Sequence, residues 1–292
     1  MADLASTLAS TVIFLFAEDS QAPIGTAFVI GYPVSGMSDT VVPLVVTAKH
    51  VVGDREKVIG RFTAKSGPVP VTVLYDLIDL RRKGDVWEHP DEGVDLLVFR
   101  TPHFEAVDYQ PFPVALIASK RNYAEEDIKA TDRVIFPCLL VNFMGTARNY
   151  PVIRSGSIAL IPGEPVPLEY DVGVRRIRTA QQVILIDATS IPGASGSPVF
   201  LGPEPRSKGE AFMLGGTQPW LLGVMHGFYP ALPRELVGVQ TNRVVPAFAE
   251  NSGIAIVFPS WFLHEILECD DVTKRIQELI TGEKRGEKRL VR

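Results

Sequence analysis

Short apolar runs separated by turn residues occupy most of this chain. The clearest lie at 11–17, 25–30 and 41–47, and the last is rich in β-branched residues. Further runs of this kind lie at 58–62, 69–78, 95–99, 134–143, 152–161, 175–186, 198–200, 220–226 and 253–257. The intervening segments contain many glycines and prolines, which are typical of turns. Because short strands recur along the chain, the pattern predicts an all-β barrel or sandwich.

Only the end of the chain has a helical pattern. Ser260 is a candidate N-cap, and the apolar residues 262, 263, 266 and 267 fall on one helical face. The pattern continues over 272–280, so we expect a C-terminal helix over 260–281. Residues 282–292 are basic and offer little that can pack, which indicates a flexible tail. The polar segment 81–92 is expected to be a surface loop, and 103–130 has no clear pattern.

Composition narrows the class of protein. The chain has 292 residues, of which 46% are hydrophobic and 22% charged, as in an ordinary globular domain. A net charge of −5 gives no basic field for nucleic acid. Cys138 and Cys269 make no disulfide framework and favour a reducing compartment. The apolar run at 12–17 lacks a cationic flank and is too short for a signal-peptide core or a membrane span. We therefore expect a cytoplasmic protein with one domain over 1–281 and no nucleic-acid or membrane partner.

The segment 187–199 holds the strongest candidate chemistry. Its core, Gly-Ala-Ser-Gly-Ser-Pro over 193–198, reads as a loop that exposes Ser195. Gly193 can adopt backbone angles that let its N–H and that of Ser195 point into one pocket, where they would bind a developing oxyanion. A serine nucleophile also needs a histidine base and a carboxylate that orients it. Taken alone, the segment is equally well explained as a glycine-serine turn between two strands.

Among the five histidines, His50 is the best candidate base because it stands at the end of a hydrophobic strand. His226, which ends another apolar strand, is a rival. The three others are expected on the surface or in the terminal helix: His89, His103 and His264. Asp95 is the best candidate orienter, since four apolar residues follow it and a buried carboxylate must find hydrogen-bond partners.

The order His50, Asp95, Ser195 and the motifs around them resemble the chymotrypsin-like serine peptidases, above all the HtrA/Deg branch. Similar motifs are Gly-Thr-Ala-Phe-Val-Ile at 25–30, Asp-Ala at 187–188, Pro-Gly-Ala-Ser-Gly at 192–196, Leu-Gly-Val-Met at 222–225 and Ile-Ala-Ile-Val-Phe-Pro-Ser at 254–260. The likeness extends from about residue 11 to about residue 268. It implies a fold of two six-stranded β-barrels, roughly 1–130 and 131–258, with the site in the crevice between them.

The resemblance also implies a role for each residue. His50 is the general base, Asp95 orients it, Ser195 is the nucleophile, and Gly193 and Ser195 donate the N–H groups of the oxyanion hole. Ala194 departs from the family, which usually has Asn or Asp there, so activation by a newly cut N-terminus is not expected. The PDZ domain that follows the peptidase domain in most HtrA proteins has no counterpart in this sequence.

The expected specificity pocket has two walls. They consist of Thr189, Ser190 and Ile191 on one side and of Met225, His226 and Gly227 on the other. No carboxylate stands where a reader of Arg or Lys would need one, so the pocket suits a small or medium hydrophobic side chain. Two alternatives remain for His226: recognition of an acidic or amide side chain, or packing near Asp95 as a supporting group.

Two hypotheses of function follow. The first is a serine endopeptidase that forms an acyl-enzyme on protein or peptide substrates. Narrow specificity or dependence on an activating protein partner would limit its activity. The second is a latent or inactive binding module with a protease fold. The sequence has no Cys-pair spacing, no His-Glu-x-x-His motif and no phosphate-binding glycine loop, so we expect no metal and no cofactor.

Overall fold

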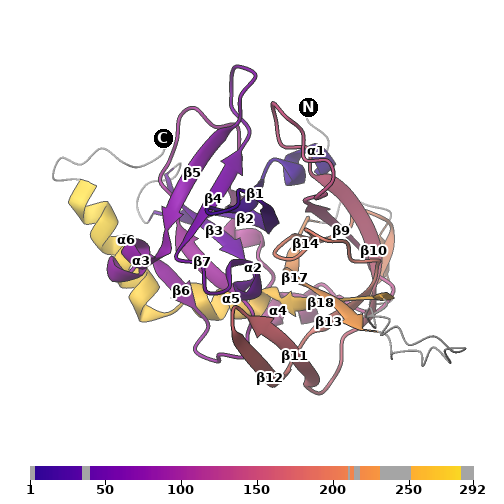
Figure 1. Ribbon diagram of the computed structural model, residues 1–292. Helices are drawn as coiled ribbons and strands as arrows, with labels where there is room; N and C mark the ends of the chain where they lie inside the picture. The colour runs from indigo at the N-terminus through magenta and orange to yellow at the C-terminus, as the bar shows by residue number, and fades with distance from the viewer. Residues whose placement is uncertain (1–3, 35–39, 210, 214–217, 231–250, 284–292) are drawn as a thin grey trace, which may run out of the picture.

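The protein is mostly β-structure in two halves, with two helices at the end of the chain (Figure 1). The computed structural model describes residues 4–34, 40–209, 211–213, 218–230 and 251–283. The first half is a single large sheet, and the second is a closed barrel. None of the described helices is long and apolar enough to cross a bilayer.

The first half is a curled sheet of eight strands. In spatial order it contains β5 (Val71–Asp76), β4 (Lys57–Phe62), β1 (Val12–Ala17), β2 (Pro23–Pro33), β3 (Val41–Thr47), β7 (Leu97–Arg100) and β6 (Val86–Glu88), with β8 (Phe112–Pro113) parallel to β2. The resemblance implied a closed barrel of six strands here. In the described part of the chain, the outer strands β5 and β6 do not pair, and α3 (Leu77–Arg82), which connects them along the chain, contacts both. This half is therefore an open half-barrel.

The second half is a closed barrel of six strands, as expected. Around the barrel the order is β10 (Val152–Leu160), β13 (Ile184–Asp187), β18 (Asn251–Pro259), β17 (Leu221–Pro230), β14 (Pro198–Leu201) and β9 (Arg133–Cys138). The predicted strand over 175–186 is in fact two strands. Its first part is β12 (Arg175–Gln181), which forms a separate hairpin with β11 (Val166–Val172), and its second part is β13.

Several short elements complete the fold. They are α1 (Leu4–Ala9), α2 (Lys49–Val52), the single 3-10 turn Val114–Leu116, α4 (Lys120–Glu125) and the hairpin of β15 (Arg206–Lys208) with β16 (Ala211–Met213). The segment 103–130, which has no clear sequence pattern, thus contributes a two-residue strand and short helical turns. The expected loop 81–92 contains β6, a strand too short for sequence periodicity to reveal.

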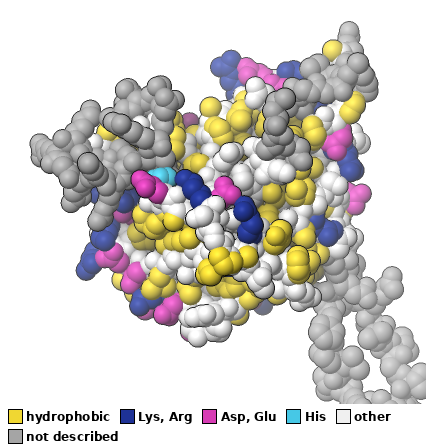
Figure 2. Space-filling view, turned by 90° about the horizontal axis from the view of Figure 1, so that it is seen from above, with side chains coloured by type: hydrophobic (Ala, Val, Ile, Leu, Met, Phe, Trp, Pro, Cys, Tyr) yellow, Lys and Arg dark blue, Asp and Glu magenta, His cyan; other side chains and the backbone are white. Residues whose placement is uncertain are grey.

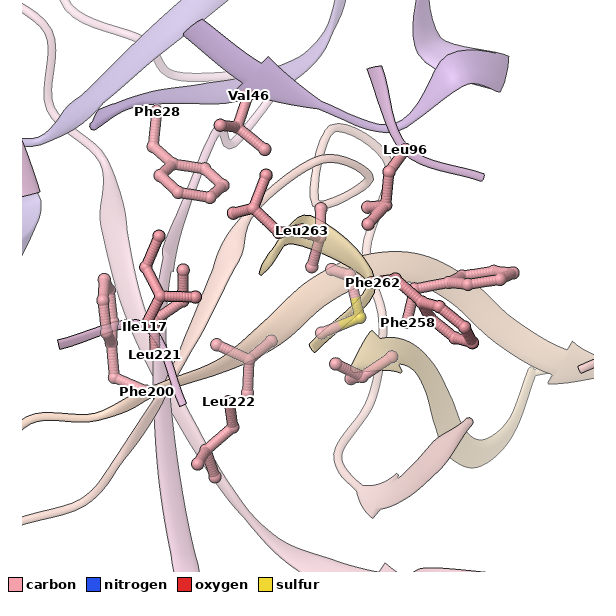
Figure 3. Close-up of a cluster of buried hydrophobic side chains, with 14 of the residues drawn as sticks. Phe28, Val46, Leu96, Ile117, Phe200, Leu221, Leu222, Phe258, Phe262 and Leu263 are labelled. Carbon is pink, nitrogen blue, oxygen red and sulfur yellow. The ribbon is translucent and has the colours of Figure 1, made fainter. Parts of the chain in front are cut away.

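The terminal helix is split in two. It consists of α5 (Ser260–Leu267) and α6 (Asp270–Glu283), with a break at 268–269. Leu263 of α5 is fully buried and lies between Phe28 and Val46 of the first half and Leu221 of the barrel (Figure 3). Burial of one such side chain contributes roughly 1.5–3 kcal/mol. The expected tail over 282–292 lies outside the described residues, apart from the last two positions of α6.

One continuous hydrophobic cluster connects the two halves. It includes Phe28 and Val46 from the first sheet and Phe200 and Phe258 from the barrel. On the face drawn in Figure 2, Lys and Arg side chains are interspersed with Asp and Glu. The shared core fixes the junction of the two halves, and the candidate site lies at that junction.

Candidate active site

His50 lies at the junction of β3 and α2 and is held by a single carboxylate. Its ring Nδ1 lies 2.5 Å from Asp95 Oδ2, and its backbone N–H donates to Asp95 Oδ1 over 2.9 Å. The neighbouring Lys49 donates from Nζ to the Glu92 carbonyl over 2.9 Å. The two bonds to Asp95 fix both the ring and the main chain of His50, so the imidazole has a defined direction.

Asp95 is fully buried between Val94 and Leu96, which are also buried. A third donor reaches it, because Nδ1 of His226 lies 2.5 Å from the same Oδ2 that His50 contacts. Burial alone would raise the pKa of Asp95, but the charge of His50 and the hydrogen bonds from His226 and His50 lower it well below its ordinary value. The carboxylate is therefore ionised and can only accept, so both histidines carry a proton on Nδ1.

The same contacts affect the basicity of His50. Burial disfavours the charged imidazolium, but the negative charge of Asp95 and its hydrogen bond outweigh this effect and raise the pKa of His50 above its ordinary value. With Nδ1 protonated, neutral His50 has Nε2 free to accept a proton. This tautomer is the one that a general base requires.

His226 reaches Asp95 because it is the extra residue of a β-bulge in β17. The register with β18 shifts between Met225 and Gly227, so His226 has no partner of its own there. A bulge interrupts the alternation of side chains and can re-aim one of them. The His226 ring then packs edge-on against Tyr170 at a centroid distance of 4.7 Å and against Phe258 at 5.5 Å. Of the three sequence interpretations of His226, this geometry matches the contact with Asp95.

Ser195 shares a cavity of about 320 Å³ with His50. Its hydroxyl donates to the backbone carbonyl of His226 over 2.8 Å. Within the described part of the chain, no hydrogen bond joins Ser195 Oγ to His50. The hydroxyl and the imidazole thus line one space, and the hydroxyl proton is held by the main chain of β17.

The loop before Ser195 is a tight turn that leaves two N–H groups unpaired in the described structure. Ala194 N–H donates to the Ile191 carbonyl over 3.0 Å, and Gly193 has a φ of 97°. Pro at the second position and Gly with positive φ at the third are the signature of a type II turn. Among the described residues, the N–H groups of Gly193 and Ser195 have no hydrogen-bond partner. They remain available to a ligand in the cavity.

Two buried threonines anchor this loop to the first half of the molecule. Thr26 Oγ1 donates to the Gly193 carbonyl over 2.6 Å, and Thr26 N–H donates to the Ser195 carbonyl over 2.9 Å. Thr47 Oγ1 in turn donates to the Thr26 carbonyl over 2.8 Å. A Cβ at Gly196 would collide with these two threonines, so only glycine fits there. In the sequence, the only sign of this role is a threonine inside an otherwise apolar strand.

The cavity contains part of the expected specificity pocket. Ser190, Ile191, His226 and Gly227 line it, while Met225 is fully buried and Thr189 is exposed. Pro192 and Phe228, which sequence analysis did not select for the pocket, also line it.

The trio His50, Asp95 and His226 also offers donor atoms of the kind that bind metals. One ligand atom from each lies within 4.8 Å of the others, and no other such group occurs among the described residues. Both Nδ1 atoms and the carboxylate already satisfy one another by hydrogen bonds. These contacts favour an electrostatic pairing over a metal centre.

His89 was expected on the surface, but the structure places it largely out of solvent. Its Nε2 lies 2.8 Å from Glu265 Oε2, and its ring packs edge-on against Phe262 of α5. The side chain is only 11% exposed. His89 therefore belongs to the contact between the loop that follows β6 and the terminal helices.

Comparison with known proteins identifies the fold. No protein-family model matches the chain, and no curated protein matches it. Among solved structures, the apo form of the MamO protease domain from Magnetospirillum magneticum aligns over 89% of this chain and 97% of its own, with 13% identity and a TM-score of 0.51. The HtrA-type protease AlgW with a decapeptide aligns over 94% of this chain and 66% of its own, with 11% identity and a TM-score of 0.46. Over most of its length, the chain is structurally similar to trypsin-like protease domains.

Proposed function

We propose that the protein is a serine endopeptidase in which Ser195, His50 and Asp95 form the catalytic triad. The observation that carries this proposal is the Asp95–His50 pair at the wall of a cavity that Ser195 shares. The available N–H groups of Gly193 and Ser195 supply the second requirement, a site for the oxyanion.

The reaction starts when a peptide carbonyl occupies the cavity. The Ser195 hydroxyl leaves the His226 carbonyl, gives its proton to His50 Nε2 and attacks the carbonyl carbon. The N–H groups of Gly193 and Ser195 bind the oxygen that becomes negative. The tetrahedral intermediate then expels the amine, which takes the proton from His50, and an acyl-enzyme remains. Water, activated by His50, releases the acid by the reverse sequence, while Asp95 stays ionised throughout.

The lining of the cavity favours an apolar side chain of the substrate. Ile191, Pro192 and Phe228 contribute hydrophobic surface, and no carboxylate is among the described lining residues. The pairing of β14 with β17 extends only to Val224, so the following part of β17 borders the cavity without β14. A peptide can add to this edge as an extended strand, which gives main-chain hydrogen bonds. The substrate class is thus an extended segment with a small or medium hydrophobic residue before the cleaved bond.

Labelling with a fluorophosphonate tests this function directly. We expect Ser195 to be labelled in the wild type and no labelling in Ser195→Ala, with strongly reduced labelling in His50→Ala. Ser66→Ala is a matched control, because Ser66 is an exposed loop serine. A proteomic profile of new N-termini, with Ser195→Ala as the blank, then identifies the preferred residue. If the wild type is not labelled and produces no new termini, either alone or after addition of peptide ligands, the peptidase assignment is wrong.

One observation favours a second candidate, a latent enzyme that needs a ligand. The Ser195 proton is held by the His226 carbonyl, on the strand edge where a peptide would bind. A peptide N–H that takes this carbonyl would free the hydroxyl for His50. Labelling rates with and without a saturating non-cleavable peptide distinguish the two candidates, because only the latent form is accelerated.

A further inference from the structure

We propose that His226 is a positioning residue that holds the Asp95 carboxylate in line with His50. The inference rests on the proposed function of the same site and adds a fourth side chain to it. Among the described residues, the His226 ring forms its hydrogen bond with Asp95, while only the backbone carbonyl of His226 accepts from Ser195. Its ring acts through Asp95.

The acceptor positions of Asp95 are divided between two elements. Oδ1 receives the backbone N–H of His50, while Oδ2 receives Nδ1 of His50 and Nδ1 of His226. The two imidazole rings meet edge-on, with centroids 4.9 Å apart and an angle of 75°. Rotation of the carboxylate about its side-chain bonds would break a contact to α2 and a contact to β17 together. His226 therefore locks the direction in which Asp95 faces His50.

The His226 ring is itself held in place by its neighbours. The bulge aims its ring inward, and the rings of Tyr170 and Phe258 pack on it. Tyr170 lies on β11, and its hydroxyl donates to the Gly93 carbonyl over 2.9 Å, two positions before Asp95. The support thus comes from the barrel, while the carboxylate comes from the first half.

The hairpin of β11 and β12 reinforces the same junction at two more points. Gln181 Nε2 donates to Asp91 Oδ2 over 2.8 Å, and the backbone N–H of Val174 donates to Asp54 Oδ2 over 2.6 Å. Asp91 precedes Asp95, and Asp54 follows the helix that carries His50. The hairpin is therefore a brace across both segments that bear the pair, and Tyr170 connects it to His226.

The two histidines share the negative charge of Asp95. When two donors share Oδ2, part of the carboxylate charge is satisfied by His226, so less of it stabilises the protonated form of His50. Removal of the His226 donor leaves that charge to His50 alone. The other ionisable groups around the trio come from α2, β6, the loop before Asp95 and the β11–β12 hairpin, and they stay in place: Lys49, Glu88, Asp91, Glu92, Tyr170 and Arg175. The substitution therefore isolates the effect of one donor.

A pair of amide variants tests the proposal. In His226→Asn the amide nitrogen lies near the position of Nδ1 and can still donate to Asp95, whereas in His226→Gln it lies near the position of Nε2 and cannot. We expect His226→Gln to lose roughly 10- to 100-fold in kcat with little change in KM, because the base is no longer aligned. We expect the acid limb of kcat/KM of His226→Gln to move to higher pH by about half a unit or more. The acid limb of His226→Asn should stay near that of the wild type. Glu169→Gln, an exposed change on the same hairpin, is the control for unspecific effects.

A second measurement separates this proposal from the proposed function. In a Ser195→Ala background, NMR titration of the His50 imidazole reports its pKa without any turnover. If the wild type proves inactive towards peptides, this titration still shows whether Gln, but not Asn, at position 226 raises the pKa of His50. Equal titration of His50 in both variants, or equal loss of activity in both, would overturn the positioning role.

Discussion

At the scale of single residues, the site depends on one ionised carboxylate with no exposed surface. Asp95 accepts from the backbone N–H of His50 and from two imidazoles, and this arrangement sets the proton on Nδ1 of each ring. Replacement of an acceptor by a donor at this point has a predictable result, because an amide N–H facing His50 favours the opposite tautomer.

Asp95→Asn is therefore expected to lower kcat by about 10⁴, the loss that the equivalent replacement causes in a well-studied Ser-His-Asp triad. The residue keeps its size, so the far-UV circular dichroism and the cavity should change little. Steady-state kinetics on a peptide found by N-terminal profiling measure the loss. A decrease of less than tenfold would mean that Asp95 does not orient the base.

The pH dependence of kcat/KM follows from the sign of the His50 shift. The base must be neutral, and the pKa of His50 is raised, so activity falls as the pH drops through that raised value. We expect the midpoint of the acid limb to lie above the ordinary imidazole value of about 6.5. Initial rates at substrate concentrations below KM over the range from pH 5 to 9 give the midpoint. A midpoint clearly below the ordinary value would contradict the assignment of His50 as the base.

Sequence motifs select His50, Asp95 and Ser195 as candidates, because each stands in a local context that differs from ordinary surface positions. Other contacts depend on features that the sequence does not encode locally. His226 reaches Asp95 only through a bulge, and Thr26 reaches the serine loop only because the two halves pack together. A bulge and a contact between distant segments both require the register of strands, which a single sequence does not specify.

At the scale of elements, β2 is connected to the serine loop through Thr26, which therefore supports the proposed oxyanion hole. Thr26→Val keeps the shape but removes the hydroxyl, so the Gly193 carbonyl and the Leu139 N–H lose their partner. We expect a destabilisation of about 1–3 kcal/mol in urea unfolding, together with slower fluorophosphonate labelling. Thr72→Val, at an exposed position of β5, should have neither effect. Normal labelling by Thr26→Val would show that the loop holds its form without this anchor.

A second connection between elements is formed by Arg61 of β4. Its guanidinium donates to the carbonyls of Met144, Gly145 and Thr146 and to Asn149 Oδ1, so a loop of the second half is held by a strand of the first. The residue is 7% exposed. This contact was not predicted, because a single arginine in a strand gives no sign of the carbonyls that it will meet.

Arg61→Met is expected to lower the free energy of unfolding by about 2–4 kcal/mol, since several main-chain carbonyls lose a charged donor at once and Asn149 loses its partner. Urea unfolding followed by tryptophan fluorescence measures the change. Arg148→Ala is the control on the same loop, because its exposed ion pair with Asp108 should contribute less than about 1 kcal/mol. Similar changes in both variants would indicate a general sensitivity of the loop.

At the scale of the whole molecule, the site exists only where the two halves meet. The first half supplies His50, Asp95 and Thr26, and the barrel supplies Gly193, Ser195 and His226. The closed barrel could be expected from the strand pattern and the family likeness. The open edge of the first sheet could not, because α3, the helix that follows β5 along the chain, has only six residues and is too short for a periodic signal.

The terminal helix α5 lies in the core between these halves, so it should couple their stability. Leu263→Ala removes a fully buried side chain that lies between Phe28 and Leu221 (Figure 3), and we expect a loss of about 2–5 kcal/mol. Because the same core serves both halves, differential scanning calorimetry should show one transition that moves to lower temperature as a unit. Lys274→Ala, on the exposed side of α6, should leave the transition in place. Two separate transitions in Leu263→Ala would mean that the halves fold independently, and the alignment of His50 with Ser195 would then depend on something other than this shared core.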